Sequence, residues 1–234
     1  MALTVDEQRI IAGIDAAAAG LCAVADQIHD LAELGYEEHR SSALLQQELA
    51  GAGYSVEAGC AGLPTAFRAR LAGALPGPAI GLLAEFDALP GIGHACGHNL
   101  IGTAAAGAAI GLAAVQGKLP GSVTVFGTPA EEGYRPNAGG KVVMHAAGLF
   151  RDMDAIMIVH PGEPYTAGGT SLARDNFRLR FRGRRPAERG RPGRSSSPRP
   201  WSRRAPRAPW RRRRGRRRAP PPRAGRAGGP SGRR

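Results

Sequence analysis

Apolar positions in the first part of the chain recur with the period of an α-helix. Ile10, Ile14 and Leu21 fall on one face at three- to four-residue spacing or its multiples. A threonine followed by two acids precedes this pattern, which is a typical helix start. We therefore expect a helix of roughly 30 residues that ends near Gly35. A second helix is predicted over residues 38–50.

Further along, the apolar positions change to the patterns of strands, separated by glycine and proline. Strands are predicted over residues 54–57, 65–71, 79–86, 122–126, 155–160 and 171–181. Helices are predicted between them over residues 99–116 and 140–147. Because strands alternate with helices, we predict an α/β fold with a mostly parallel sheet flanked by helices.

Charge is distributed very unevenly along the chain. Residues 183–234 hold 20 arginines and one acid, Glu188, so they carry a net charge of +19, whereas residues 1–182 carry a net charge of −6. The segment 183–234 also lacks Leu, Ile, Val, Phe, Met and Tyr, so it cannot bury enough apolar surface to fold. We therefore predict a folded domain over residues 1–182 and a disordered, Arg/Pro-rich tail over residues 183–234.

The three cysteines, Cys22, Cys60 and Cys96, are too few for a disulfide framework and indicate a reducing compartment. Charged residues interrupt the N-terminus where a signal peptide needs an apolar run. The apolar stretch over residues 100–115 is too short to cross a membrane. We expect a cytoplasmic protein with no membrane partner.

Metal-type ligands follow three of the predicted strands. Cys96 and His98 come after the third strand, Glu131 and Glu132 after the fourth, and His160 closes the fifth. Sites in α/β sheets lie at the carboxyl ends of the strands, so these side chains are expected to converge. Each alone would more often be structural, as an isolated cysteine is a small buried hydrophobe. Together, thiolate, imidazole and carboxylate favour a site for Zn²⁺ or a similar divalent metal.

Three strings in the sequence resemble those of a known family. They are AEFDALP at residues 84–90, HACGHN at 94–99 and GTPAEEGYRPNAGG at 127–140. They resemble the aminoacylase and carboxypeptidase G family of metallopeptidases, peptidase family M20, and within it the p-aminobenzoyl-glutamate hydrolase-like branch. The resemblance covers residues 5–182 and implies an incomplete zinc-exopeptidase-like catalytic domain. It also implies hydrolysis of an amide bond in an N-acyl amino acid, a dipeptide or a p-aminobenzoyl-glutamate-like substrate through a metal-activated water.

The same resemblance implies a role for each site residue. The metal ligands are Cys96, His98, Glu132 and His160. They would hold two divalent ions, zinc first, with manganese or cobalt as alternatives. Glu131 corresponds to the catalytic general base that activates water, and Asp87 to the acid that orients the ligand shell. Glu85 stands where some relatives have a ligand histidine, and whether it contacts metal stays open.

The family usually continues with an inserted lid or dimerisation domain and a returning segment, which supply further histidines. No histidine follows His160 in this sequence. Because the composition changes abruptly to residues with GC-rich codons, we expect residues 183–234 to be an out-of-frame translation. The chain as written is then expected to be poorly soluble and weakly active or inactive. Relatives often form homodimers through the inserted domain, so no oligomeric state is predicted.

An alternative hypothesis is a non-enzymatic protein that binds nucleic acid through the arginine-rich tail on a decayed hydrolase scaffold. The retained ligand set favours the enzyme, so a small amide or dipeptide is the expected partner rather than nucleic acid. Salt-dependent binding of labelled nucleic acid that is lost on removal of residues 183–234 would favour the alternative.

Overall fold

The computed structural model describes residues 3–135, 137–162 and 166–168. These residues belong to one compact unit, Met1–Ser171. The strand predicted over residues 171–181 and the tail predicted over residues 183–234 lie outside the described residues.

The described elements agree with the predicted ones in type and order. The helices are α1 (Val5–Leu31), α2 (His39–Gly51), α3 (His98–Ala113) and α4 (Gly140–Ala146), with the 3₁₀ turns η1 (Cys60–Gly62) and η2 (Gln116–Lys118). The strands are β1 (Ser55–Ala58), β2 (Phe67–Ala72), β3 (Leu75–Ala84), β4 (Pro120–Gly127) and β5 (Ala155–Met157). One predicted bound is wrong in a way that matters for the site. β5 ends at Met157, where its pairing with β3 ends, so His160 lies in the loop beyond the strand.

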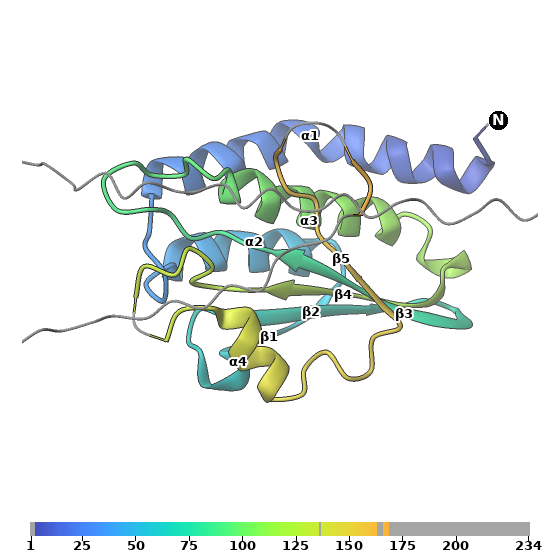
Figure 1. The fold of residues 1–234 in the computed structure, drawn as a ribbon. Coiled ribbons are helices and arrows are strands. Elements are labelled where there is room, and N and C mark those ends of the chain that lie inside the picture. The colour runs from blue at the N-terminus through green and yellow to red at the C-terminus, as the bar shows by residue number, and fades with distance from the viewer. Residues whose placement is uncertain (1–2, 136, 163–165, 169–234) are drawn as a thin grey trace, which may run out of the picture. The chain divides into compact units, whose positions relative to one another are not determined.

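The sheet has the strand order β1-β2-β4-β3-β5 (Figure 1). β3 pairs in parallel with β4 and with β5, whereas β2 pairs antiparallel with both β1 and β4. A parallel pair needs a crossover, which α3 supplies between β3 and β4, while a short connection suffices for the antiparallel pair β1 and β2. The predicted α/β class is confirmed; among the described strands the sheet is mixed only through β2, which runs opposite to β1, β3, β4 and β5.

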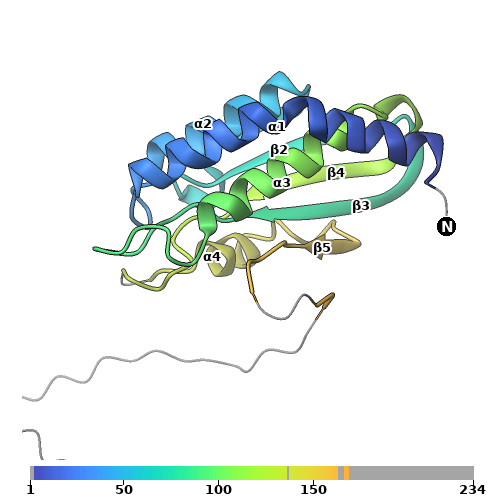
Figure 2. The ribbon, with the colours of Figure 1, turned by 90° about the horizontal axis from the view of Figure 1, so that it is seen from above.

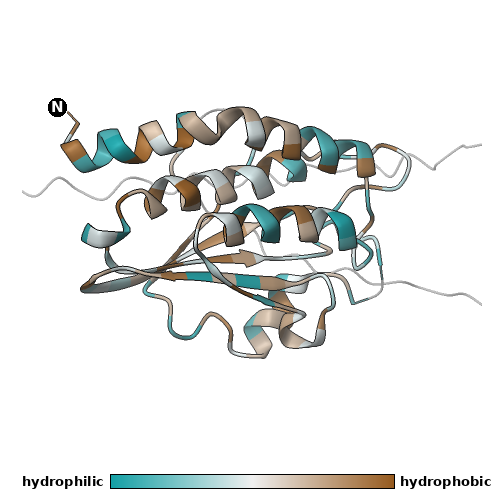
Figure 3. Ribbon diagram, turned by 180° about the vertical axis from the view of Figure 1, so that it is seen from behind, coloured by the Kyte–Doolittle hydropathy of each residue, from teal (hydrophilic) through white to brown (hydrophobic). Residues whose placement is uncertain are grey.

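Helices α2 and α3 pack on one face of the sheet, and α1 packs on them from outside (Figures 1 and 2). The core between them is formed by buried residues of α1, α2, α3 and β2–β4. Glycines in α3 allow α1 to approach closely. A Cβ on Gly111 would lie 2.7 Å from Cγ1 of Ile14, and a Cβ on Gly107 would lie 3.0 Å from Cδ1 of Leu21. In Figure 3, α2 alternates between hydrophilic and hydrophobic residues, whereas α3 is mostly white to brown along its length.

A smaller apolar cluster lies on the opposite face of the sheet, beneath α4. Its buried members are Cys60, Ala66, Phe126 and Met144. Phe126 of β4 stacks edge-on against Phe150, with ring centroids 4.9 Å apart. This cluster fixes α4 against the end of the sheet, which brings the first turn of α4 to the site described below.

Among the described residues, α1 is the one helix long and apolar enough to cross a membrane by length and composition alone. Its start is fixed by a capping box between Thr4 and Glu7. Near its end Val24, Ala25 and Ile28 are buried in the domain. α1 therefore forms an outer layer of the α/β unit in this structure.

Candidate metal centre

The parallel strands deliver the predicted site residues to one edge of the sheet. β3, β4 and β5 all run in the same direction, so the segments that follow them meet at their carboxyl ends. The N-terminus of α3 reaches the same edge, because α3 begins the return crossover. These segments carry Asp87, Cys96, His98, Glu131, Glu132 and His160.

His98, the first residue of α3, lies at the centre of the site and is 0% exposed. Its Nδ1 lies 3.0 Å from both the backbone oxygen and the Oδ1 of Asp87. A proton on Nδ1 donates to these oxygens and leaves a lone pair on Nε2. Nε2 is buried and has no hydrogen-bond partner among the described residues. An imidazole nitrogen that is buried, unpartnered and oriented by a carboxylate fits the role of a metal ligand.

The other predicted ligands surround Nε2 of His98. One ligand atom from each of Cys96, His98 and His160 lies within 4.8 Å of the others. Sγ of Cys96 is 3.7 Å from Nε2 of His160, and Oε1 of Glu132 is 3.9 Å from Nε2 of His98. Sulfur, two imidazoles and a carboxylate form a donor set that zinc accepts. The structure thus brings all four predicted ligands together.

A second group of candidate ligands shares the same imidazole. Oε2 of Glu85 lies 3.3 Å, and Oε2 of Glu131 3.7 Å, from Nε2 of His98. Lys141, at the start of α4, forms an ion pair with Oε1 of Glu85 and lies 3.9 Å from Oε1 of Glu131. The sequence left Glu85 open and gave no role to Lys141. A lysine directly after two glycines at a helix start was the signal available.

Asp87 connects His98 to the turn that carries the two adjacent glutamates. Its Oδ2 accepts a hydrogen bond of 3.1 Å from the backbone amide of Glu132. Burial raises the pKa of Asp87, but the hydrogen bonds from His98 and from the turn outweigh it, so the net pKa is lowered. Burial lowers the pKa of His98, but the hydrogen bond and charge of Asp87, with Glu85 and Glu132, raise it overall. Asp87 is thus an ionised carboxylate that fixes the imidazole.

Most ionisable side chains of the candidate metal centre are acidic. Burial, followed by the charges of Glu132 and Glu131, raises the pKa of the Cys96 thiol to about 11. Burial is also the largest cause that raises the pKa of Glu132. A divalent cation placed among these groups would stabilise the thiolate and the carboxylates together, as metal binding at such sites displaces protons. The donor set and its electrostatics therefore fit a metal ion.

Glu38 is not a candidate ligand, but its side chain stabilises the turn that carries Glu131 and Glu132. It was not identified from the sequence. It is 0% exposed, and its Oε2 accepts a hydrogen bond of 2.9 Å from Oγ1 of Thr65. Its Oε1 accepts one of 2.8 Å from the amide of Ala130. Ala130 has a left-handed φ of 56°, and a Cβ on Gly35 would lie 2.8 Å from its Cβ. Only glycine at position 35 therefore leaves room for this turn.

Two other residues of the HACGHN string have structural partners. Nε2 of His94 lies 3.0 Å from the Ile28 carbonyl oxygen, and Nδ2 of Asn99 donates to the Ala25 carbonyl at 3.2 Å. Both contacts fix the ligand loop to α1. Gly97 has a φ of +81°, and a Cβ there would lie 2.9 Å from Cγ of Pro161. The loop that carries Cys96 and the loop that carries His160 therefore depend on a glycine at position 97.

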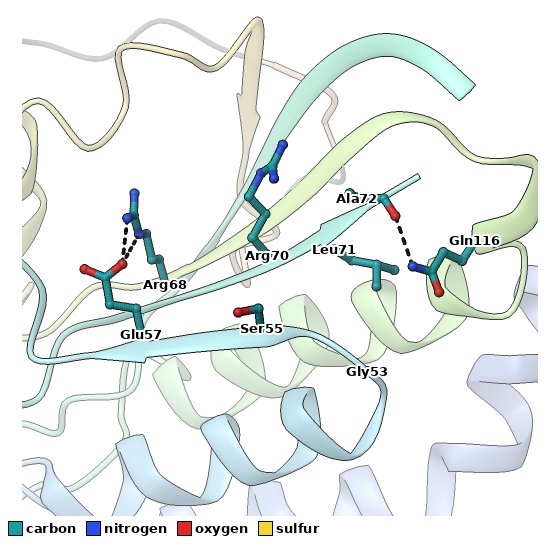
Figure 4. A pocket seen from close by; sticks show the side chains of 8 residues that line it. All are labelled: Gly53, Ser55, Glu57, Arg68, Arg70, Leu71, Ala72 and Gln116. Carbon is teal, nitrogen blue, oxygen red and sulfur yellow. Dashed lines mark hydrogen bonds and ion pairs between the residues drawn. The ribbon is translucent and has the colours of Figure 1, made fainter. Parts of the chain in front are cut away.

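Two pockets help to delimit the site. The pocket drawn in Figure 4 lies along β1 and β2, has a volume of about 460 Å³ and holds the ion pair between Arg68 and Glu57. It contains none of the predicted ligands. A second pocket of about 340 Å³ adjoins Lys141 and is lined by Leu83, Lys141, Val142, His145, Phe150 and Ile156. Of the site residues named above, Lys141 is the one in its lining.

Comparison with known proteins gives one consistent result. Residues 74–193, more than half of the chain, match the profile of peptidase family M20/M25/M40. The chain is 39% identical over 191 residues to Xaa-Arg dipeptidase of Homo sapiens, an alignment that covers 73% of this chain and 42% of that protein. It is 38% identical over 157 residues to a polypeptide of the p-aminobenzoyl-glutamate hydrolase of Escherichia coli K12, covering 59% of this chain and 31% of that polypeptide.

A solved structure gives the same picture. A dinuclear metal-binding peptidase from the M20 family of Bacillus subtilis superposes with a TM-score of 0.55 at 26% identity, covering 61% of this chain and 42% of that one. The chain spans less than half of the length of each of these relatives.

Proposed function

Because the chain belongs to peptidase family M20/M25/M40, we propose that it acts as a metal-dependent amidohydrolase or peptidase. The observation that carries the proposal is Nε2 of His98. It is fully buried, has no hydrogen-bond partner among the described residues, and is faced by the ligand atoms of Cys96 and His160. The family resemblance of the three sequence strings is confirmed by the profile match.

The proposed substrates are small molecules with an amide bond beside a carboxylate. The human relative is named as a dipeptidase, and the Escherichia coli relative as a hydrolase of p-aminobenzoyl-glutamate. Dipeptides and p-aminobenzoyl-glutamate share an amide bond next to an amino-acid carboxylate. An N-acyl amino acid has the same arrangement, so we propose all three as substrate classes for this chain.

Cys96, His98, Glu132 and His160 would hold the divalent metal. We propose zinc first, because the donor set combines a thiolate with imidazoles, and manganese or cobalt as alternatives. The Bacillus subtilis relative is described as dinuclear, and two ions are proposed here as well. When bound, such ions lower the pKa of water and polarise a carbonyl group.

We propose different roles for the two adjacent glutamates, Glu131 and Glu132. Glu132 has a side chain that is 15% exposed and a backbone amide fixed by Asp87, so it suits a ligand. Glu131 has a side chain that is 37% exposed, which leaves its carboxylate able to reach a substrate. We assign Glu131 as the group that takes a proton from water and delivers it to the leaving amine. Asp87 holds His98 in the tautomer that presents Nε2.

The test measures metal content and hydrolysis on the same protein. The 234-residue chain is loaded with zinc and assayed on dipeptides, N-acetyl amino acids and p-aminobenzoyl-glutamate, before and after chelation. We expect at most weak hydrolysis from this chain, and chelation should abolish it. Glu131→Gln should keep the metal content and lose about 10²- to 10⁴-fold in rate. A fully active Glu131→Gln would refute its role, and hydrolysis that survives chelation would contradict the proposed metal dependence.

We also propose a cytoplasmic location. Its support is that Cys22, Cys60 and Cys96 are all free thiols in the structure. Fractionation of cells that express the tagged chain checks this, and recovery in the membrane or secreted fraction would contradict it.

A further inference from the structure

A lysine ammonium lies beside the carboxylates at the edge of the candidate metal centre. Lys141 comes from the first turn of α4, on the opposite side of the sheet from α3. Its Nζ forms an ion pair with Oε1 of Glu85 and lies 3.9 Å from Oε1 of Glu131. The Glu85 side chain is 2% exposed and that of Lys141 31% exposed. Lys141 is therefore the counter-ion of a buried carboxylate.

The two groups of candidate ligands compete for one atom. Cys96 and His160 form one group with His98, and Glu85 and Glu131 form the other with the same His98. Nδ1 of His98 is committed to Asp87, so only Nε2 has a lone pair available to a metal. One lone pair binds one ion, and the charges around each group decide which of the two groups that ion also contacts.

The two groups of candidate ligands differ in the charge that surrounds them. Glu85 and Glu131 face the positive charge of Lys141, so a divalent cation placed between them would be repelled by the ammonium at short range. Cys96 instead faces an imidazole, since its Sγ lies 3.7 Å from Nε2 of His160, and no salt bridge among the described residues brings a lysine or arginine to this group. Among the described residues, no salt bridge joins another lysine or arginine to Glu85, Glu131 or Glu132.

We propose that Lys141 is a positioning residue that directs metal to the Cys96 and His160 side of His98. It does so by holding Glu85 as an ion pair, which keeps this carboxylate out of metal coordination. Glu85 is then a buried counter-ion rather than a ligand. This inference rests on the proposed metal centre. It addresses whether Glu85 contacts metal, which the sequence left open.

The consequence can be measured without any substrate. Co²⁺ bound to a thiolate gives a charge-transfer absorption, so the absorption per bound Co²⁺ reports how much of the metal lies on the Cys96 side. The 234-residue chain is stripped of metal and titrated with Co²⁺, and with Zn²⁺ against a chelator of known affinity. The variants are Glu85→Gln, Lys141→Met and the double variant, which remove charge with little change of shape.

We expect Glu85→Gln to keep the absorption per Co²⁺ and to change the Zn²⁺ dissociation constant by less than about threefold. Lys141→Met should lower the absorption per Co²⁺ by about half or more, because Glu85 and Glu131 then attract the ion. The double variant should restore it. Lys118→Met is the matched control, since Lys118 pairs with exposed Asp6 far from the site, and it should behave as the unchanged chain.

Two results would overturn the proposal. One is a loss of Zn²⁺ affinity of about tenfold or more in Glu85→Gln, which would make Glu85 a ligand. The other is an unchanged absorption per Co²⁺ in Lys141→Met. If Lys141→Met does not fold, as circular dichroism would reveal, the Glu85→Gln titration still decides. Absence of the absorption in the unchanged chain would instead refute the metal centre itself, and the role of Lys141 with it.

Discussion

Glu38 and Ala130, which are 92 residues apart in the chain, are joined by a buried hydrogen bond of 2.8 Å from the Ala130 amide to Oε1 of Glu38. Ala130 immediately precedes Glu131 and Glu132, and its backbone is left-handed. The geometry of the two adjacent glutamates therefore depends on a side chain at the start of α2. This relationship explains how a helix far from the ligands in sequence affects the site.

Replacement of Glu38 by alanine should destabilise the domain. The substitution leaves the buried Ala130 amide and the Thr65 hydroxyl without an acceptor, at a cost of about 1–3 kcal/mol for the unsatisfied groups. Urea unfolding of the metal-free chain measures this loss. Glu37→Gln is the matched control, because Glu37 forms an exposed ion pair with Arg135 and should change stability by less than about 1 kcal/mol. Equal effects of the two substitutions would show that the buried hydrogen bonds of Glu38 do not contribute to stability.

The charge of Glu38 should also appear in the pH dependence of stability. Burial is the largest effect on the pKa of Glu38 and raises it above its ordinary value of 4.5. The folded chain therefore binds more protons than the unfolded chain above that pH, so its stability falls as pH rises toward the raised pKa. Glu38→Gln lacks this contribution. Unfolding free energies measured with chelator from about pH 4.5 to about pH 8 should therefore shift in favour of Glu38→Gln as pH rises, whereas a constant difference would contradict the account.

Asp87→Asn should weaken metal binding. The substitution removes the charge that stabilises His98 and the second oxygen that accepts from the Glu132 amide. Loss of such a partner typically costs 10- to 100-fold in metal affinity, and we expect about that loss in a Zn²⁺ competition titration. Asp154→Asn is the control, because Asp154 is exposed and accepts from the Ala79 amide in the middle of β3, before the strand end that leads to the site. An affinity of Asp87→Asn within the error of Asp154→Asn would refute the role of Asp87.

Gly97→Ala should disturb the loop that carries His160. Gly97 and Gly91 both have positive φ, 81° and 77°, so alanine at either position is strained by about 1–2 kcal/mol. A Cβ on Gly97 would also lie 2.9 Å from Cγ of Pro161, whereas a Cβ on Gly91 has no neighbour within 4 Å. We expect Gly97→Ala to lower both thermal stability and Zn²⁺ affinity, and Gly91→Ala to lower stability alone. A normal Zn²⁺ affinity of Gly97→Ala would contradict the contact.

The sequence predicted the elements and the ligand positions well, for a physical reason. Helix periodicity and strand ends are local patterns, and Cys96, His98 and Glu132 follow strands whose carboxyl ends must meet in a parallel arrangement. The structure brings these three residues and His160 together as predicted, while their roles remain proposals.

The contacts that cross the fold were not predictable in the same way. In the sequence, Glu38 has the pattern of an ordinary acidic residue at a helix start. Its buried partners, Thr65 and Ala130, are distant in sequence. Lys141 resembles a solvated helix residue until β3 brings Glu85 beside it. The opposite direction of β2 was not predicted, because strand direction depends on pairing partners, which apolar patterns do not specify.

The central claim is that Cys96 and His98 form part of a metal centre, and Co²⁺ titration of the metal-free 234-residue chain tests it most directly. The account predicts a thiolate-to-cobalt absorption that is lost in Cys96→Ser and retained in Cys22→Ser and Cys60→Ser, whose thiols lie outside the site. Absence of the absorption in the unchanged chain, or its persistence in Cys96→Ser, would contradict the account.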